Sequence, residues 1–390
     1  MPVLSVVIPT HERFRYARHT VDAVLRMSDD IEVVVSDTSA KDAWSDAGLY
    51  GSSDRLKIVR PPTGISVVDN FNIALGHATG DFVCFIGDDD LVTPDVMQIV
   101  RQAAAEGVDA IRFAFPVLFY WHDYAHKALP EAYAGTIWAS DYVASIRPLD
   151  TKRSLNNALA QLGRGVFDMP RIYCGIIARS LIDRVIERHG ALFGGVSPDI
   201  YSAALLSAHA TQAIDLDFPA VIPGASGAST AGQSAAGKHV GALRDNDHIR
   251  PFKNLVWHAL VPEFYSVPTV WSYSFVRALE QIDEDLVLRA NWGRLYAQCL
   301  MYHRRYRSET LTAMRAYACR TSPAALMAAV SKGIAAETAW AAKRVGKRLS
   351  VRHGTTKDLR FAGADDVDSA LAIIGEVVAK GPKPVWPTTK

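Results

Sequence analysis

The sequence predicts an α/β protein whose mostly parallel sheet is covered by helices on both faces. In the first hundred residues, short runs rich in apolar and β-branched residues alternate with segments of helical periodicity. These runs are apolar throughout, as is typical of strands buried on both faces. Because a helix-length segment separates each run from the next, the connections are of the kind that places neighbouring strands parallel.

Four strands and two helices are expected in this first part. The strands are predicted at residues 4–9, 31–35, 56–59 and 82–86, and the helices at residues 15–27 and 67–78. In the middle of the chain we expect strands at residues 110–120 and 172–178, and helices at residues 180–188 and 199–209. Beyond residue 250 the pattern is mostly helical to about residue 350.

At 390 residues the chain is long enough for two domains, or for one domain with a large appendage. We expect an α/β domain over residues 1–223 and a mostly helical region over residues 242–390. Residues 224–241 are rich in Gly, Ser and Ala, which suits either a flexible linker or a lid that orders over a ligand.

The composition is that of a soluble globular protein, with 49% hydrophobic and 21% charged residues and a net charge of +1. This balance argues against a nucleic-acid partner, which calls for a basic surplus. The four cysteines are scattered without CxxC spacing, which favours reduced thiols. No apolar run approaches the roughly 20 residues needed to span a bilayer, and the first residues do not resemble a signal peptide. We expect a cytoplasmic protein.

The most informative motif is Asp88-Asp89-Asp90, directly after the strand predicted at residues 82–86. Adjacent carboxylates repel one another, so their place at a strand end indicates a cation. In an extended backbone Asp88 and Asp90 share a face. Mg²⁺ or Mn²⁺ takes one or two carboxylates and fills its other positions with water and phosphate oxygens. The alternative is a solvated acidic turn that precedes a helix.

The other predicted strands also end in polar residues. Residues 10–13, Asp37 and Gly64 stand at these ends, together with the acidic triplet. Ligands of open parallel sheets bind outside the carboxyl ends of the strands. The polar chemistry is therefore expected on one edge of the sheet.

Three features in this order resemble family 2 glycosyltransferases of the GT-A fold. They are residues 5–10 (SVVIPT), Asp37, and the pattern from Asn70 through Ala74, Ala78 and Gly80 to Asp90. The match covers about the first 100 residues well and extends thinly to about residue 210. The resemblance implies inverting transfer of a sugar, with Mg²⁺ or Mn²⁺, from a nucleotide-diphosphate sugar to an acceptor hydroxyl. A UDP-sugar donor is favoured, and the setting is synthesis of a surface polysaccharide or glycan.

The resemblance also implies roles for individual residues. Asp90 and Asp88 would bind the metal, and the nucleotide would contact Thr10, Glu12, Asp37, Asn70, Asp88 and Asp89. The chain departs from the family in two places. Asp69 stands where many relatives have a basic residue, and Val196-Ser197-Pro198-Asp199 stands where many have Glu-Asp.

Asp199 is the candidate general base. The acceptor hydroxyl loses a proton as it attacks, and a carboxylate on the opposite face of the sugar can take it. The alternative is structural, because an Asp in the first turn of a helix favours the helix dipole. Asp215 and Asp217 are the next candidates for the base.

Two further segments carry open alternatives. If residues 224–241 form a lid, Lys238 would contact the donor phosphates and His239 the metal. Residues 323–352 read either as a helix packed on the rest of the protein or as an interfacial helix on anionic lipid at the inner face of the membrane. The second alternative suits a lipid-linked saccharide acceptor rather than a free one.

Other functions fit less well. A nucleotidyltransferase usually has a Gly-rich loop after its first strand, and residues 9–14 contain no glycine. A phosphohydrolase would need a nucleophilic Asp where Thr10 stands, and a dinucleotide oxidoreductase would need a GxGxxG after a strand. A non-catalytic relative that binds a nucleotide sugar remains an alternative.

Overall fold

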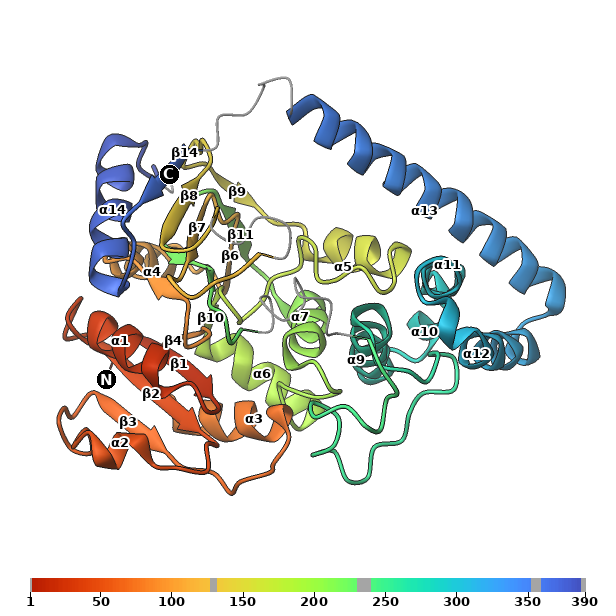
Figure 1. Ribbon diagram of the computed structural model, residues 1–390, viewed down its shortest axis with the longest axis horizontal. Coiled ribbons are helices and arrows are strands. Elements are labelled where there is room, and N and C mark those ends of the chain that lie inside the picture. Colours follow the sequence, from red (N-terminus) through yellow and green to blue (C-terminus); the bar gives the residue numbers. More distant parts are fainter. Residues whose placement is uncertain (1, 127–131, 230–239, 352–358, 387–390) are drawn as a thin grey trace.

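A computed structural model describes residues 2–126, 132–229, 240–351 and 359–386. Its centre is an eight-stranded sheet with the strand order β3-β2-β1-β4-β10-β6-β11-β9 (Figure 1). The strands of this sheet are β1 (Leu4–Thr10), β2 (Ile31–Asp37), β3 (Leu56–Val59), β4 (Phe82–Phe85), β6 (Ala110–Phe113), β9 (Ile146–Pro148), β10 (Ile176–Ala178) and β11 (Ala213–Leu216).

Most of the strands run in one direction. β1 pairs in parallel with β2 and β4, β2 with β3, and β6 with β11. β10 is antiparallel to both β4 and β6, so these two strands have the same direction. Only β9 and β10 run against the others in this sheet. The mostly parallel α/β sheet predicted from the sequence is therefore confirmed.

Helices cover both faces of this sheet, and alternate residues of β1 show it. Val7 belongs to a core cluster that also contains side chains of α3 (Val67–His77), α6 (Arg179–His189) and α7 (Pro198–His209). Its neighbours Val6 and Ile8 belong to a second cluster with α1 (Phe14–Leu25) and α4 (Asp95–Ala105). Because successive residues of a strand point to opposite faces, these two clusters lie on opposite sides of the sheet.

Two strand predictions differ from the structure. The run at residues 110–120 forms two strands, β6 and β7 (Val117–Tyr120), because the chain turns at Phe115, whose φ is 56°. The strand expected at residues 172–178 is reduced to β10. β7 lies in a second sheet, of order β13-β7-β8-β14, with β8 (Thr136–Ala139), β13 (Gly224–Ala225) and β14 (Leu359–Ala362). β5 (Leu91–Val92) and β12 (Val221–Ile222) form a two-stranded sheet.

Helices α9 to α13 follow one another on the side of the molecule where α5 and α7 lie, and α9 packs against α7 (Figure 1). These helices are α9 (Val267–Ile282), α10 (Asp285–Arg289), α11 (Trp292–Tyr302), the short helix η1 (Arg304–Tyr306), α12 (Arg307–Arg320) and α13 (Pro323–Val351). Helices α2 (Ala43–Asp46) and α5 (Thr151–Ala160) occur earlier in the chain. α13 crosses α11 closely, since a Cβ on Gly333 would lie 2.1 Å from the carbonyl oxygen of Gly293. Glu337 is fully buried there and accepts a hydrogen bond from Nε of Arg294 at 2.9 Å. One face of α13 is therefore packed, while Met327 and Ile334 are exposed.

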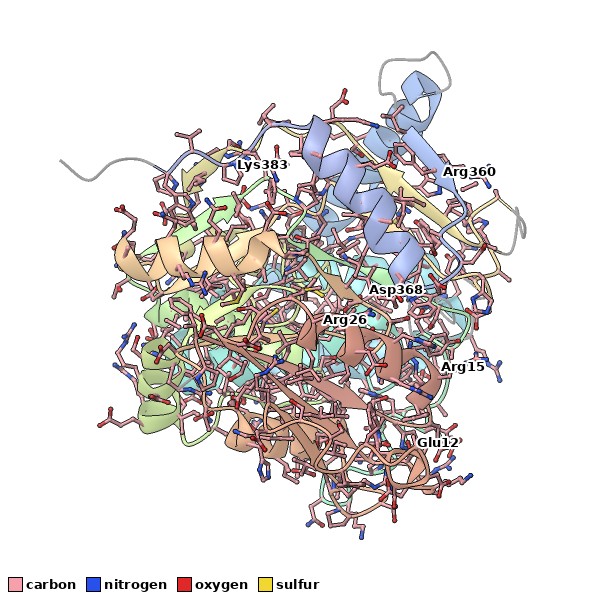
Figure 2. All side chains as sticks on the ribbon, turned by 90° about the vertical axis from the view of Figure 1, so that its left-hand side faces the viewer. Glu12, Arg15, Arg26, Arg360, Asp368 and Lys383 are labelled. Atoms are coloured by element: carbon pink, nitrogen blue, oxygen red, sulfur yellow. The ribbon has the colours of Figure 1, made fainter. Side chains whose placement is uncertain are left out.

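The last described segment returns to the first domain. β14 pairs antiparallel with β8, and α14 (Val367–Lys380) places Ile374 in the core cluster that contains α1. Asp368 of α14 forms an ion pair with Arg26, as Figure 2 shows from the side of α14. Residues 242–390 are thus divided in space, and the domain boundaries inferred from the sequence stay a prediction. Within the described ranges, no helix is both long and apolar enough to cross a membrane.

Candidate active site

The acidic triplet lies at the carboxyl end of β4, beside the end of β1. Asp88, Asp89 and Asp90 are 2%, 4% and 4% exposed, so these carboxylates do not form a solvated turn. Thr10, the last residue of β1, donates its hydroxyl to Oδ2 of Asp88 at 2.6 Å. The pairing of β1 with β4 therefore brings together two residues that the sequence placed on one edge of the sheet.

Arg13 is the cation of this cluster, and the sequence analysis did not identify it. Its Nη2 lies 3.0 Å from Oδ1 of Asp88 and 2.8 Å from Oδ2 of Asp89. Burial lowers the pKa of Arg13, but its attraction to Asp88 and Asp89 outweighs this effect and leaves the pKa raised. Arg13 therefore stays charged beside the triplet. The available signal was a basic residue in the loop after the first strand.

Backbone amides and side-chain donors, most of them distant in sequence, hold the other two carboxylates. Asp90 accepts hydrogen bonds from the amides of Gly87 and Gly224, both at 2.7 Å, and from the thiol of Cys174 at 3.2 Å. The amide and hydroxyl of Ser226 donate to Oδ2 of Asp89 at 3.0 and 2.7 Å. The first residues of the Gly/Ser-rich segment are therefore packed on the triplet.

Lys238 and His239 lie outside the described residues, so the contacts expected of them stay predictions.

The charge of the cluster fits a divalent cation. Burial raises the pKa values of Asp88 and Asp90, and the charge of Asp89 raises both further, because Arg13 supplies one positive charge against three carboxylates. Oδ1 of Asp88 is buried and accepts no hydrogen bond from the residues that the structure describes, although it faces Arg13. Mg²⁺ and Mn²⁺ prefer such oxygen ligands. In the described part of the chain, however, no three His, Cys, Asp or Glu side chains gather as a ready-made metal site.

Two cavities meet at Arg13. The first has a volume of about 500 Å³ and lies between the ends of β1 and β2 and the start of α3; its lining includes Thr10, His11, Arg13, Thr38, Asn70, Asp88 and His248. The second has a volume of about 300 Å³, and its lining includes Arg13, Asp89, Asp90, Phe115, Arg171, Cys174 and Asp199. A third cavity of about 700 Å³ contacts Asp69 and shares Gly64 and Pro251 with the first.

The structure thus gathers most of the predicted site residues but separates two of them. Glu12 and Asp37 are not among the lining residues of the first or second cavity. Oε1 of Glu12 accepts from the amide of Ala40 at 2.7 Å, and Asp37 accepts from the indole of Trp44 at 3.0 Å. Both carboxylates bind the chain that follows β2, and their contact with a nucleotide stays a prediction.

Asp199 is positioned by the start of α7. Pro198 occupies the first turn of that helix, and Asp199 follows it and lines the second cavity. Burial raises the pKa of Asp199, while backbone amides and the charge of Arg171 oppose the rise. A carboxylate with a raised pKa is a better proton acceptor than an ordinary one.

The two alternative bases lie elsewhere. Asp215 forms ion pairs with Arg112 and Arg147, and Asp217 accepts a hydrogen bond from the amide of Val143 at 2.9 Å. Neither lines the second cavity. The geometry therefore favours Asp199 as the base among the three.

Comparison with known proteins agrees with this geometry. The family model Glycosyl transferase family 2 matches residues 5–127, a span that contains β1, the acidic triplet and Arg13. Residues 5–127 are therefore similar to family 2 glycosyltransferases. The match ends before Arg171, Asp199 and the Gly/Ser-rich segment, so the second cavity is built largely outside the matched residues.

Two curated relatives are similar to part of the chain. The GalNAc(5)-diNAcBac-PP-undecaprenol beta-1,3-glucosyltransferase of Campylobacter jejuni is 30% identical over 116 residues, which are 27% of this chain and 36% of that protein. An uncharacterized protein of Sinorhizobium fredii is 26% identical over 118 residues, which are 28% of this chain and 13% of that protein. The chain thus matches little more than a third of the first relative and about an eighth of the second.

Solved structures give a distant likeness. TarS 1–349 of S. aureus in complex with UDP-GlcNAc has a TM-score of 0.46 at 13% identity, over 82% of this chain and 92% of that one. The mannosyltransferase PcManGT of Pyrobaculum calidifontis, in complex with GDP-Man and Mn²⁺, has a TM-score of 0.38 at 18% identity, over 85% of this chain and 87% of that one. At TM-scores below 0.5 these likenesses carry no argument about the site.

Proposed function

We propose that this protein is an inverting glycosyltransferase, which moves a sugar from a nucleotide-diphosphate sugar to an acceptor hydroxyl. The similarity of residues 5–127 to family 2 glycosyltransferases and the glucosyltransferase relative support sugar transfer. The observation that carries the proposal is the placement of Asp199 in the same small cavity as Asp89 and Asp90. A candidate base and the acidic loop thus line one space, as displacement at the anomeric carbon requires.

The first cavity is the proposed nucleotide site, with a UDP-sugar as the favoured donor. Its volume of about 500 Å³ suits a nucleoside diphosphate. Asn70 accepts the hydroxyl of Ser36 at 2.6 Å, which fixes its amide at the wall of the cavity. Arg13 belongs to both cavities, so its guanidinium is available where the diphosphate would pass from one to the other.

The second cavity is the proposed place of reaction. The acceptor hydroxyl would attack from the side of Asp199, which takes the proton while the diphosphate leaves toward Arg13. Burial raises the pKa of Asp199 and so makes its carboxylate a stronger base. Attack from the face opposite the leaving group inverts the anomeric carbon.

Asp88 and Asp90 are the proposed ligands of Mg²⁺ or Mn²⁺. A bound divalent ion neutralises negative charge that develops on the departing diphosphate. Thr10 and the amides of Gly87 and Gly224 orient the two carboxylates in advance. The buried and incompletely balanced charge of the triplet supports this assignment.

Thermal unfolding with a panel of nucleoside diphosphates, with and without Mn²⁺, tests the donor. A ligand that binds only the folded state raises its apparent stability. UDP with Mn²⁺ is expected to raise the Tm more than UDP alone. No shift with UDP, GDP or dTDP would refute the proposed donor class.

Turnover of Asp199→Asn tests the base, with Asp215→Asn as the matched control. Asp199→Asn is expected to lower kcat by roughly 10²–10⁴-fold while nucleotide affinity is unchanged. Asp215→Asn is expected to keep kcat, because its carboxylate pairs with Arg112 and Arg147 outside the cavity. Equal turnover of Asp199→Asn and wild type would remove Asp199 from the mechanism, and nucleotide binding without any transfer would indicate a non-catalytic relative.

The acceptor that we propose is a saccharide hydroxyl in surface polysaccharide or glycan synthesis, free or linked to a lipid. The relative whose name includes PP-undecaprenol supports the lipid-linked form. Helix α13, whose exposed side chains include Met327, Ile334, Lys343 and Arg344, is the proposed peripheral contact with an anionic membrane. Flotation with liposomes that contain anionic lipid is expected to carry the protein upward, whereas protein left at the bottom would exclude this contact.

A further inference from the structure

Arg171 is a charged side chain in the second cavity to which the proposed mechanism gives no role. It lines the cavity together with Asp90 and Asp199, and its guanidinium carbon lies 4.5 Å from the centre of the Phe115 ring. Its Nε is buried and has no hydrogen-bond partner. Across the described ranges of the chain, the guanidinium makes neither a hydrogen bond nor an ion pair.

The backbone holds Arg171 in a fixed place. The amide of Phe85 donates to the carbonyl of Ile172 at 3.0 Å, and the amide of Cys174 donates back to Phe85 at 2.7 Å, so the residues after Arg171 are tied to the end of β4. A Cβ on Gly175 would lie 2.0 Å from the carbonyl oxygen of Arg171, which shows how closely this turn is packed. The side chain is therefore presented from a rigid element.

Neighbouring charges do not satisfy this guanidinium. Burial lowers the pKa of Arg171 and Arg112 lowers it further, while Asp199 and Asp215 raise it at a distance without preventing the net fall. Arg171 is half-buried, with its Nε out of contact with solvent, and an unpaired cation in such a place destabilises a folded protein unless something compensates it. Arg112, by contrast, is paired directly with Asp215. The difference between these two arginines indicates that the partner of Arg171 is a ligand.

The chemistry of that ligand follows from the guanidinium. Its planar N–H groups match the paired oxygens of a carboxylate or phosphate, and the flat face that rests on Phe115 leaves its edge free for such contacts. Arg171 does not line the first cavity, whereas Arg13 lines both. The anion it would meet is therefore carried by the sugar or the acceptor and not by the nucleoside.

We propose that Arg171 is a specificity-determining residue that binds a phosphate or carboxylate on the transferred sugar or on the acceptor. The proposal rests on the proposed function, since it takes the second cavity as the place where sugar and acceptor meet. It assigns to this protein an anionic sugar substrate. The phosphate of a glycosyl phosphate acceptor and the carboxylate of an acidic donor sugar share this chemistry.

The experiment compares wild type with Arg171→Gln, Arg171→Lys and the control Arg112→Gln. UDP with Mn²⁺ is titrated first, and all four proteins are expected to show the same rise in Tm, which also establishes that the variants fold. Absence of the rise in every protein would count against the proposed function and not against the role of Arg171. A loss of UDP affinity confined to Arg171→Gln would overturn the inference, because Arg171 would then be a diphosphate contact.

Two pairs of probes then distinguish the sources of the anion. With UDP and Mn²⁺ at saturation, N-acetylglucosamine 1-phosphate is compared with N-acetylglucosamine by calorimetry; separately, UDP-glucuronate is compared with UDP-glucose. Wild type is expected to prefer the anionic member of one pair by roughly 10–100-fold.

The pair that shows the preference identifies the acceptor or the donor sugar as the source. Arg171→Gln should lose the preference, Arg171→Lys should keep part of it, and Arg112→Gln should keep all of it. A wild type without either preference, or an Arg171→Gln variant that retains one, overturns the inference.

Discussion

Substitution of Gly224 by Ala is expected to detach the acidic triplet from the segment that holds it. Gly224 lies in β13, and its amide donates to Oδ1 of Asp90 at 2.7 Å. A Cβ at this position would lie 1.7 Å from the carbonyl oxygen of Asp89 and 2.6 Å from its carbonyl carbon. Both are backbone atoms, so rotation of a side chain cannot relieve the overlap.

The size of the effect follows from this distance. To reach an ordinary contact of 3.4 Å, the strand or the acidic loop must move by roughly 1.7 Å. That movement takes the amide of Gly224 beyond hydrogen-bond distance of Asp90, which is only 4% exposed. Loss of a hydrogen bond to a buried carboxylate costs about 1.5–3 kcal/mol, and overpacking costs about 1–3 kcal/mol. The free energy of unfolding is expected to fall by about 2.5–6 kcal/mol, with loss of turnover.

Urea unfolding and turnover of Gly224→Ala are compared with those of Gly241→Ala. Gly241 belongs to the same Gly/Ser-rich segment, but a Cβ there meets no atom within 4 Å, so its substitution should leave both measurements near wild type. If the two variants unfold at the same urea concentration and turn over equally, the packing of residues 224–229 on the triplet is not what maintains the site.

Three further substitutions and one pH profile test other parts of the reasoning. Burial raises the pKa of Asp199, and the carboxylate is the active form, so kcat/KM should rise with pH with an apparent pKa above that of an ordinary carboxyl group. Arg171→Gln removes a positive charge that opposes this rise, so it should move the acid limb of the profile to higher pH. An acid limb at the same pH in wild type and Arg171→Gln would contradict this reasoning. Burial raises the pKa of Glu32, but hydrogen bonds from Lys57 and other groups outweigh this effect and leave the pKa lowered. The ionised Glu32 side chain therefore stabilises the folded protein above about pH 4.3, and this stabilisation is lost as the pH falls through the pKa of the folded state. Glu32→Gln should therefore lower the free energy of unfolding by about 1–3 kcal/mol at pH 7, and urea curves at pH 3 should show little difference from wild type. Gly375 lies in the middle of α14 on its exposed side, and a Cβ there would meet no atom within 4 Å. Gly375→Ala should therefore increase the free energy of unfolding by about 0.5–1 kcal/mol and raise the Tm. An unchanged Tm would show that α14 unfolds separately from the rest of the protein.

The sheet and its edge could be predicted because their signals are local. β3 begins and ends at the predicted residues, and β1, β2 and β4 deviate by no more than two residues at either end. The apolar runs are long enough to identify strands, and the parallel arrangement follows from the helices between them. The same pattern placed Thr10 and Asp88 on one edge of the sheet, and in the structure a hydrogen bond joins them.

The contacts that shape the site could not be predicted in this way. Gly224 reaches Asp90 across 134 positions of sequence, and no local pattern records that pairing. Hydrophobicity likewise could not separate β6 from β7, because Ala110 to Tyr120 is apolar almost throughout and the break is a backbone turn at Phe115. The family pattern predicted that Asp37 contacts the nucleotide, whereas in the structure its carboxylate accepts a hydrogen bond from Trp44, a contact that the pattern does not contain.

The two arginines missed in the sequence show what the acidic triplet requires of its surroundings. A buried group of three carboxylates repels the phosphates of any nucleotide sugar unless positive charge stands between them. Arg13 supplies such charge where the two cavities meet, and Arg171 supplies it on the far side, where Asp199 would act. The overall charge of +1 conceals this arrangement, because it sums charges over the whole chain and does not report which of them lie at the site. An anionic substrate can therefore approach a site whose most evident feature in the sequence is negative charge.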